Sequence, residues 1–150
     1  MRVMVLIAIV LAASLSARTA DAEQIQNRGK CLTVRGNRAA NGTPIILWHC
    51  TGGVNPGQQW HFRGGQLVSL GMCLTVRGGR VDDGTNIILW PCGSPQDGAQ
   101  QWRRIDGEMR SITNRCLNVQ GGTEDDGTPI ILYHCQGGTP NELWEMVRDY

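Results

Sequence analysis

Short stretches with an apolar residue at every second position recur along the chain. Leu32 and Val34 have this spacing in the stretch CLTV, and Ile45 and Leu47 have it in the stretch PIILWHC. Because neighbours along a strand point to opposite sides, each pair marks the strand face that points into a core. No window shows convincing helical periodicity. The pattern therefore predicts an all-β protein built from short strands.

The same pattern is written three times. Aligned on their cysteines, the repeats read CLTVRGNRAANGTPIILWHC, CLTVRGGRVDDGTNIILWPC and CLNVQGGTEDDGTPIILYHC, each followed by a Gly-rich segment and then by QQW, QQW or ELW. An Asn-Gly or Asp-Gly turn signal separates the two strands of each repeat. Three repeats of about 42 residues, at about 24–66, 67–109 and 110–150, are too few for a propeller. We expect a closed barrel with threefold pseudo-symmetry, which leaves no exposed sheet edge.

Six cysteines stand at two fixed places in the repeats, and the two cysteines of each repeat are 19 residues apart. Pairing within each repeat makes the three repeats equivalent, and each closed loop then contributes about 3 kcal/mol of stability. The predicted disulfides are Cys31–Cys50, Cys73–Cys92 and Cys116–Cys135. The alternative, pairing between neighbouring repeats, needs three long-range closures. With all six thiols used, no nucleophilic thiol or metal site remains.

The disulfides also fix which side of each strand faces outward. A bond from Cys31 to Cys50 places the outer faces of the two strands on the same side. Alternation then puts one small polar residue, one isoleucine and one aromatic residue outside the core in each repeat. These are Thr33, Ile46 and Trp48, then Thr75, Ile88 and Trp90, then Asn118, Ile131 and Tyr133. A second set, Trp60, Trp102 and Trp144, is assigned to the core. An outward aromatic beside a disulfide forms a flat platform on which sugars or peptides stack.

The first 22 residues are interpreted as a signal peptide. Arg2 precedes an apolar run, and small residues flank Asp21 in the A-x-A pattern that precedes cleavage. Cleavage would leave a single secreted domain, 23–150, with no membrane span, because the apolar run is too short for one. Its charges would then balance, which argues against nucleic acid as a partner. The charges are uneven, since residues 23–72 carry five basic residues and one acidic residue; we interpret this as solvated surface.

At these residues the sequence resembles the ricin-type lectin family, whose repeats have a C-L-D-V-like start, an LW-x-C or LY-x-C phrase and a Gln-x-Trp ending. The match covers residues 24–150. The resemblance implies a β-trefoil fold with a disulfide in each repeat. It also implies no catalytic activity, no cofactor and up to three shallow pockets for galactose-like or xylan-like sugars.

This chain departs from the family at several pocket positions. The pocket aspartate is replaced in all three repeats, by Thr33, Thr75 and Asn118, and the pocket glutamine is replaced by isoleucine. The asparagine before the Gln-x-Trp ending is Gly57 in the first repeat and Ala99 in the second. Only the third repeat keeps a polar set, which consists of Asn118, Tyr133, Asn141 and Glu142.

The sequence thus predicts a secreted lectin that binds glycans or polysaccharides weakly, mainly through its third repeat. A sugar ring would stack on Tyr133, and its hydroxyls would be held by the other three polar residues of that repeat. Further candidate contacts are Trp48 and Gln58 in the first repeat and Trp90 and Gln100 in the second, although the two glutamines are also explained by bonds to backbone groups. The alternative is a protein-binding trefoil, an inhibitor or effector whose sugar pockets have decayed. No G-x-S-x-G, H-E-x-x-H or phosphate-loop motif supports an enzyme.

Overall fold

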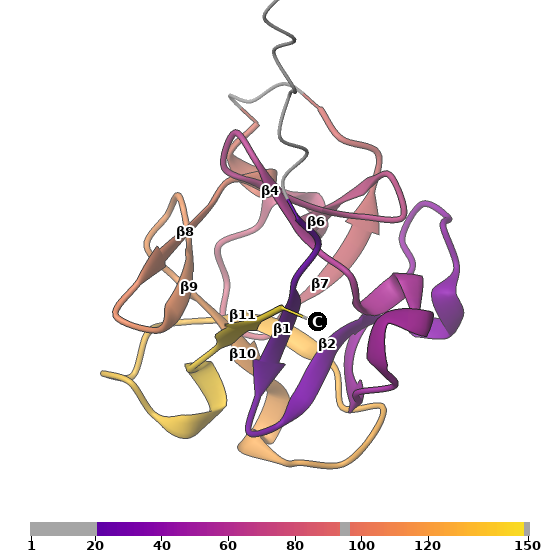
Figure 1. Cartoon of the computed structure of the whole chain (residues 1–150). Helices are drawn as coiled ribbons and strands as arrows, with labels where there is room; N and C mark the ends of the chain where they lie inside the picture. Colours follow the sequence, from indigo (N-terminus) through magenta and orange to yellow (C-terminus); the bar gives the residue numbers. More distant parts are fainter. Residues whose placement is uncertain (1–20, 94–96, 149–150) are drawn as a thin grey trace, which may run out of the picture.

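The computed structural model describes residues 21–93 and 97–148. Most of the expected signal peptide, residues 1–20, lies outside the described part of the chain. Each repeat contributes four strands (Figure 1). They are β1 (Gln24–Asn27), β2 (Lys30–Val34), β3 (Ile45–His49) and β4 (His61–Arg63); β5 (Gln66–Ser69), β6 (Met72–Val76), β7 (Thr85–Trp90) and β8 (Trp102–Ile105); and β9 (Glu108–Ser111), β10 (Cys116–Val119), β11 (Ile130–Tyr133) and β12 (Glu145–Val147).

The helical parts of the described chain are short 3-10 turns in the connections. They are η1 (Arg35–Asn37), η2 (Gly52–Val54), η3 (Pro56–Gln58), η4 (Arg77–Gly79), η5 (Gly98–Gln100), η6 (Gln120–Gly122) and η7 (Pro140–Glu142). None of the described residues forms a helix that is long and apolar enough to cross a membrane.

Six of the strands form a closed ring. Strand β1 pairs with β12, β4 pairs with β5, and β8 pairs with β9. Isolated bridges join the chain beside β1 to the chain beside β4, and β9 to the chain beside β12. Between β5 and β8, the N–H of Trp102 donates to the carbonyl of Gly65 at 2.8 Å. Figure 1 shows β1 and β12, the two ends of the described chain, side by side. Closure of the ring explains how short strands avoid leaving edges open to other chains.

The remaining strands form three antiparallel hairpins, β2–β3, β6–β7 and β10–β11. The hairpins also contact one another, because β7 pairs with β11 and isolated bridges join Pro44 to Ile88 and Ile46 to Pro129. A ring of six strands with three associated hairpins is a β-trefoil, and each repeat supplies one third of it. The predicted fold class is therefore confirmed.

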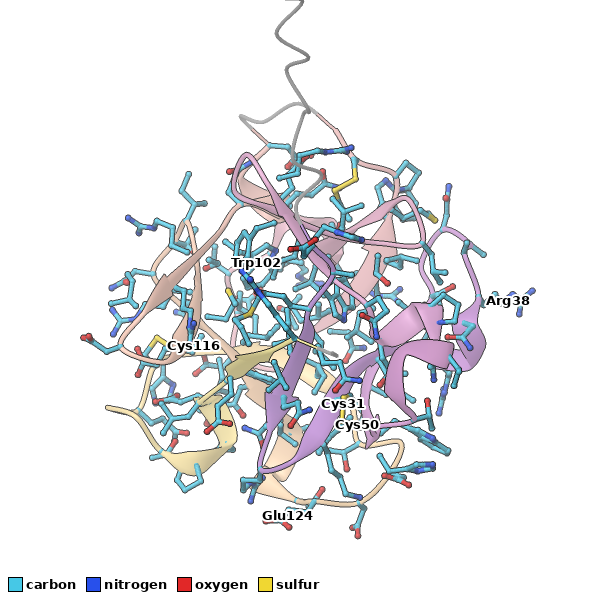
Figure 2. The ribbon with its side chains drawn as sticks, viewed as in Figure 1. Cys31, Arg38, Cys50, Trp102, Cys116 and Glu124 are labelled. Carbon is cyan, nitrogen blue, oxygen red and sulfur yellow. A yellow bond between two sulfur atoms is a disulfide. The ribbon has the colours of Figure 1, made fainter. Side chains whose placement is uncertain are left out.

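The core contains the residues that alternation assigned to it. Trp60, Trp102 and Trp144 are essentially fully buried among the inward leucines, valines and isoleucines of the hairpins. Each indole N–H donates at 2.9 to 3.0 Å to the carbonyl at the same place in its own repeat, which belongs to Leu32, Leu74 or Leu117. Figure 2 shows Trp102 in the interior of the molecule. The tryptophan that ends each repeat is therefore a core residue in all three repeats, and its indole N–H is hydrogen-bonded there.

The cysteines pair within each repeat, as Cys31–Cys50, Cys73–Cys92 and Cys116–Cys135, which confirms the pairing expected from the spacing. The alternative of pairing between repeats is wrong.

The outward isoleucines differ from expectation. Ile46, Ile88 and Ile131 lie outside the core cluster, yet they are only 4%, 4% and 6% exposed. Their cover comes from the neighbouring repeat, because Pro129 lies opposite Ile46 and Pro44 lies opposite Ile88. The three isoleucines therefore lie outside the core as expected, but they offer little exposed surface to a polypeptide partner.

Candidate ligand-binding surface

The first repeat has a hollow on its outer side, which we call the repeat-one hollow. Its volume is about 450 Å³, and its lining residues are Thr33, Val34, Arg35, Gly36, Asn37, Ile46, Trp48 and Asn55. Strand β2 ends at its floor and turns into η1, while β3 brings Trp48 to its side. Trp48 is 36% exposed. A Cβ added to Gly127 of the third repeat would lie 3.9 Å from the Trp48 ring, so the neighbouring turn supports the indole.

Two amide side chains line the repeat-one hollow beside Gly57. The Oδ1 atom of Asn37 accepts a hydrogen bond from the N–H of Gly57 at 2.9 Å, and that of Asn55 accepts from the same N–H at 3.1 Å. Asn37 has φ 53°, a left-handed conformation that asparagine tolerates better than most residues. A Cβ on residue 57 would lie only 2.3 Å from Asn37 Oδ1. Glycine at position 57 is therefore what allows the Asn37 amide to reach this place.

The third repeat has the opposite arrangement at the same two positions. Gly122 stands where the first repeat has Asn37, and Asn141 stands where it has Gly57. A Cβ on Gly122 would lie 3.6 Å from Asn141 Cβ, so the two positions face each other here too. In the second repeat they are Gly79 and Ala99, and neither carries an amide. Sequence reasoning noted the loss of the asparagine at position 57 but missed Asn37. Asn37 could have been found in the repeat alignment, because it is an asparagine where the other two repeats have glycine, Gly79 and Gly122.

The predicted third-repeat residues are partly brought together. Asn141 Nδ2 donates to Asn118 Oδ1 at 3.0 Å, and Tyr133 ends β11 with its side chain half-buried. The tyrosine ring lies 4.5 Å from the ring of His134, measured between centroids. Asn118 is 2% exposed, and its Nδ2 atom has no hydrogen-bond partner in the described part of the chain. An unsatisfied buried amide is uncommon and calls for a partner.

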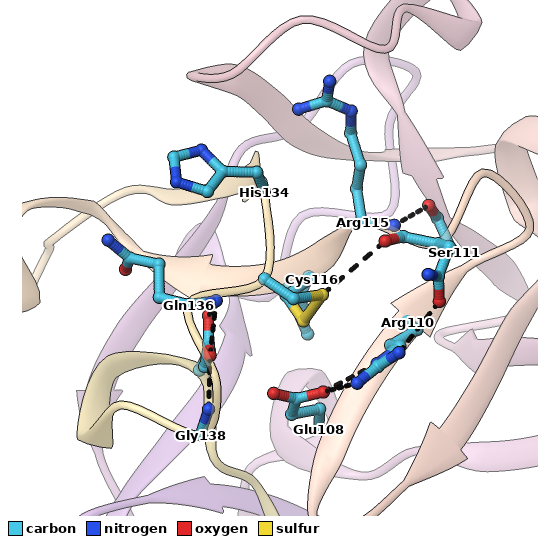
Figure 3. The surroundings of a disulfide bond; sticks show 12 residues. Glu108, Arg110, Ser111, Arg115, Cys116, His134, Gln136 and Gly138 are labelled. Atoms are coloured by element: carbon cyan, nitrogen blue, oxygen red, sulfur yellow. Dashed lines mark hydrogen bonds and ion pairs between the residues drawn. A yellow bond between two sulfur atoms is a disulfide. The ribbon is translucent and has the colours of Figure 1, made fainter.

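Glu142, the fourth residue of that set, is fully buried and accepts backbone hydrogen bonds. The N–H groups of Gln136 and Gly138 donate to its carboxylate at 2.8 and 2.9 Å (Figure 3). A carboxylate accepts but does not donate, so Glu142 holds the loop that follows Cys135. Its oxygens thus face the protein backbone.

Gln58 and Gln100 occupy the same place as Glu142 in the first two repeats and are also fully buried. Gln58 Nε2 donates to Thr33 Oγ1 at 3.1 Å and to the His49 carbonyl at 2.9 Å. Gln100 makes the same pair of bonds, to Thr75 Oγ1 and to the Pro91 carbonyl. Each amide therefore joins the first strand of its hairpin to the residue just before the second cysteine of its own repeat.

Two charged clusters join neighbouring repeats close to the outward aromatics. Asp126 accepts from Lys30 Nζ at 2.7 Å and from the backbone and the ring of His49. The hydrogen bond from Lys30 and then the bond with His49 lower the pKa of Asp126 from 3.8 to about 2. His49 follows Trp48 directly, and their ring centroids are 5.5 Å apart. This cluster therefore fixes the chain that carries Trp48.

The second cluster repeats the first around the fold. Asp83 pairs with Arg115 and with His134, whose side-chain hydrogen bond is the main cause of the lowered pKa of this carboxyl. The third contact of this kind, between the first and second repeats, has no charged side chains. Asn41 stands in place of the aspartate, Met72 in place of the lysine or arginine, and Pro91 in place of the histidine. Figure 3 shows Arg115 and His134 on the outer side of the Cys116–Cys135 disulfide.

The one group of potential metal ligands within the described residues is Glu108 with Cys116 and Cys135. Both cysteines belong to a disulfide, and Glu108 forms an ion pair with Arg110 at 2.5 Å (Figure 3). A metal site here would require free thiolates. The donor set therefore does not fit a metal ion.

Comparisons with known proteins agree with this architecture. A family model described as "Ricin-type beta-trefoil lectin domain" matches residues 21–144. No curated protein sequence matches the chain.

Several solved structures share the fold. The designed threefold-symmetric protein ThreeFoil is 28% identical, with a TM-score of 0.74 over 84% of this chain and 97% of that one. The agglutinin from Abrus precatorius is 24% identical, with a TM-score of 0.77 over 89% of this chain and 51% of that one, so this chain spans about half its length. The C-half of the earthworm R-type lectin, solved in complex with GalNAc, is 19% identical, with a TM-score of 0.71 over 85% and 98%.

Proposed function

The chain belongs to the ricin-type beta-trefoil lectin domain family, and on this premise we propose that it is a secreted lectin that binds carbohydrate without transforming it. The earthworm lectin of the same fold was solved with GalNAc, which supports a galactose-like sugar as the first ligand class to test. Secretion is supported by the signal-like sequence of residues 1–22 and by three disulfides, which persist in oxidising compartments.

The observation that carries the proposal is the pairing of an outward aromatic with asparagine amides in two of the three repeats. In the first repeat, Trp48 lines the same hollow as Asn37 and Asn55. In the third, Asn141 is bonded to Asn118, which lies on β10 two positions along the ladder from Cys116, the residue opposite Tyr133. Sugar rings have an apolar face that packs on an aromatic ring and hydroxyls that exchange hydrogen bonds with amides. We therefore assign one shallow site to each of these repeats.

Each site would act by stacking and by a few hydrogen bonds. Both aromatics are held in place by the chain around them, since each precedes a histidine that is bonded to an aspartate of a neighbouring repeat. In the third site Asn141, which is partly exposed, would offer its amide to a sugar hydroxyl, and the buried Asn118 Oδ1 accepts from its Nδ2 atom and so orients it. Because no side-chain carboxylate lines the repeat-one hollow, few charge-assisted bonds to a neutral sugar are available and the affinity should be weak.

Calorimetric titration of the oxidised protein with a galactose-containing oligosaccharide tests the proposal. We expect two sites in the unmodified protein, and we expect Trp48→Ala and Tyr133→Ala each to remove one of them. Trp90→Ala is the matched control, because Trp90 is an outward aromatic of the same kind, 44% exposed, in the repeat that has no amide at the two facing positions.

Two results would count against the proposal. If Trp90→Ala weakens binding as much as the other two variants, the amides are not what defines a site. If the folded protein binds no member of a broad glycan panel, but binds a protein partner that sugars do not displace, the outward tryptophans serve a protein interface instead.

A further inference from the structure

Arg35 occupies a distinctive place on the surface. It follows β2 directly and lines the repeat-one hollow together with Trp48. It also lines two adjoining hollows, one of about 760 Å³ beside the loop of residues 36–44 and one of about 210 Å³ between the three hairpins. Within the residues that the structure describes, no carboxylate or other side chain is bonded to its guanidinium. Arg35 is therefore an exposed and available cation at the edge of the proposed sugar site.

Two further arginines make the surface around Arg35 more positive. Arg38 lines the loop hollow, and Arg77 lines the hollow between the hairpins. No Asp or Glu is among the residues that line any of the three hollows. The other polar residues that line the repeat-one hollow are Thr33, Asn37 and Asn55, and none of them carries a charge. Figure 2 shows Arg38 projecting from the outer surface of this repeat.

The excess of basic residues in positions 23–72 is only partly neutralised by ion pairs. Of the five basic residues in positions 23–72, Arg28 and Lys30 form ion pairs with Glu124 and Asp126 of the third repeat. Arg35 and Arg38 are not used in this way. In the second repeat, by contrast, Arg80 pairs with Asp82 in the corresponding loop. The first repeat therefore keeps a net positive charge at its ligand-facing loop, and the second repeat neutralises it.

We propose that the repeat-one hollow selects glycans that carry an anionic substituent, a carboxylate or a sulfate ester. This inference rests on the proposed lectin function and names its substrate class. A sugar ring packed on Trp48 would present a substituent of the ring to Arg35, whose planar guanidinium matches the geometry of a carboxylate or sulfate group. Arg38 and Arg77 would add long-range attraction, which speeds association and weakens as salt screens it.

The test compares three oligosaccharides of the same backbone: one neutral, one with a terminal uronic acid and one with a sulfate ester. Affinity is measured by calorimetry at low and at raised salt, for the unmodified protein and for Arg35→Gln. Glutamine is the residue that the third repeat has at this position, Gln120. Arg104→Gln is the control, because it removes the same charge from β8, away from the lining of the repeat-one hollow.

We expect the anionic oligosaccharides to bind about 10-fold more tightly than the neutral one, as one charge-assisted contact at an exposed site would give. Arg35→Gln should bring this ratio close to one, and Arg104→Gln should leave it unchanged. Raised salt should lower the ratio as well. A preference for only one of the two anionic forms would identify the group that the site takes.

Other outcomes separate the inference from the proposed function. If all three oligosaccharides bind equally, or if both arginine variants lower the ratio by the same factor, the selection by Arg35 is wrong and the lectin function stands. If the folded protein binds none of them, and no other glycan, both the inference and the proposed function fail.

Discussion

The contact between Asn37 and Gly57 offers a direct test of how the repeat-one hollow is built. The two residues are the reverse of the pair Gly122 and Asn141 in the third repeat. Three variants are informative: Asn37→Gly, Gly57→Asn and the double substitution, which copies the third-repeat arrangement into the first repeat. Each single substitution breaks the hydrogen bond of 2.9 Å between Asn37 Oδ1 and the Gly57 N–H.

The expected change in the free energy of unfolding of each variant depends on whether this hydrogen bond is lost. Asn37→Gly loses about 1 kcal/mol for the bond and regains about 0.5–1 kcal/mol, since glycine adopts a left-handed φ without strain. Gly57→Asn loses the same bond, because its Cβ would lie 2.3 Å from Asn37 Oδ1 and the amide must rotate away. The new Cβ also lies 3.2 Å from the Val34 carbonyl oxygen, a tight contact that is present in the double variant too. The double variant loses the bond once, so it should be about 1 kcal/mol more stable than the sum of the single effects.

Urea unfolding of the oxidised protein, followed by tryptophan fluorescence, measures these differences. Binding gives a second and independent readout. Asn37→Gly should weaken glycan binding at the first repeat about 5-fold, the value of one neutral hydrogen bond. The double variant should recover most of that loss, because Asn at position 57 returns an amide to the hollow.

Strict additivity would refute the reasoning about stability. If the double variant equals the sum of the two single variants within about 0.3 kcal/mol, residues 37 and 57 do not share the contact described above. If stability couples but the double variant does not recover binding, the amide serves the fold and not the ligand.

Three further predictions concern stability. As pH falls from about 4 to about 2, the free energy of unfolding should decrease. The pKa of Asp126 is lowered from 3.8 to about 2, so its ion pairs stabilise the fold above pH 4 and are lost on protonation. Asp126→Asn should flatten this part of a plot of unfolding free energy, measured in urea, against pH, and an unchanged slope would contradict the assignment. Trp102→Phe should cost about 2–3 kcal/mol in the same assay, because the Leu74 carbonyl loses its indole donor and the core loses volume; a cost below about 0.5 kcal/mol would mean that the repeated indole bond is dispensable. Replacing Cys73 and Cys92 together by serine should lower stability by about 3 kcal/mol, as expected for a loop of this length, with thermal unfolding as the measurement and an unchanged midpoint as the contrary result.

The candidate site was only partly accessible to sequence reasoning. The outward positions of Trp48 and Trp90 and the bond between Asn141 and Asn118 lie where alternation and the repeat alignment put polar and aromatic residues together. Glu142 was expected to face a ligand, and the structure places it at 0% exposure under the loop that it holds. A loop that folds back over a side chain leaves no periodic signal in the sequence, so burial of this kind is not readable from spacing.

The sequence by itself determined the threefold repeat, the strands, the three disulfides and the core side of each strand. These features depend on local alternation, on turn residues and on a spacing of 19 that recurs in each repeat, and all of them act within a few tens of residues. Only the tertiary structure decided the burial of Ile46 where its strand meets Pro129, the approach of Asn37 to Gly57 and the absence of a side-chain partner for the Arg35 guanidinium in the described chain. Each of these depends on which segment of another repeat or loop lies against the residue, and that choice is made by packing of the whole chain.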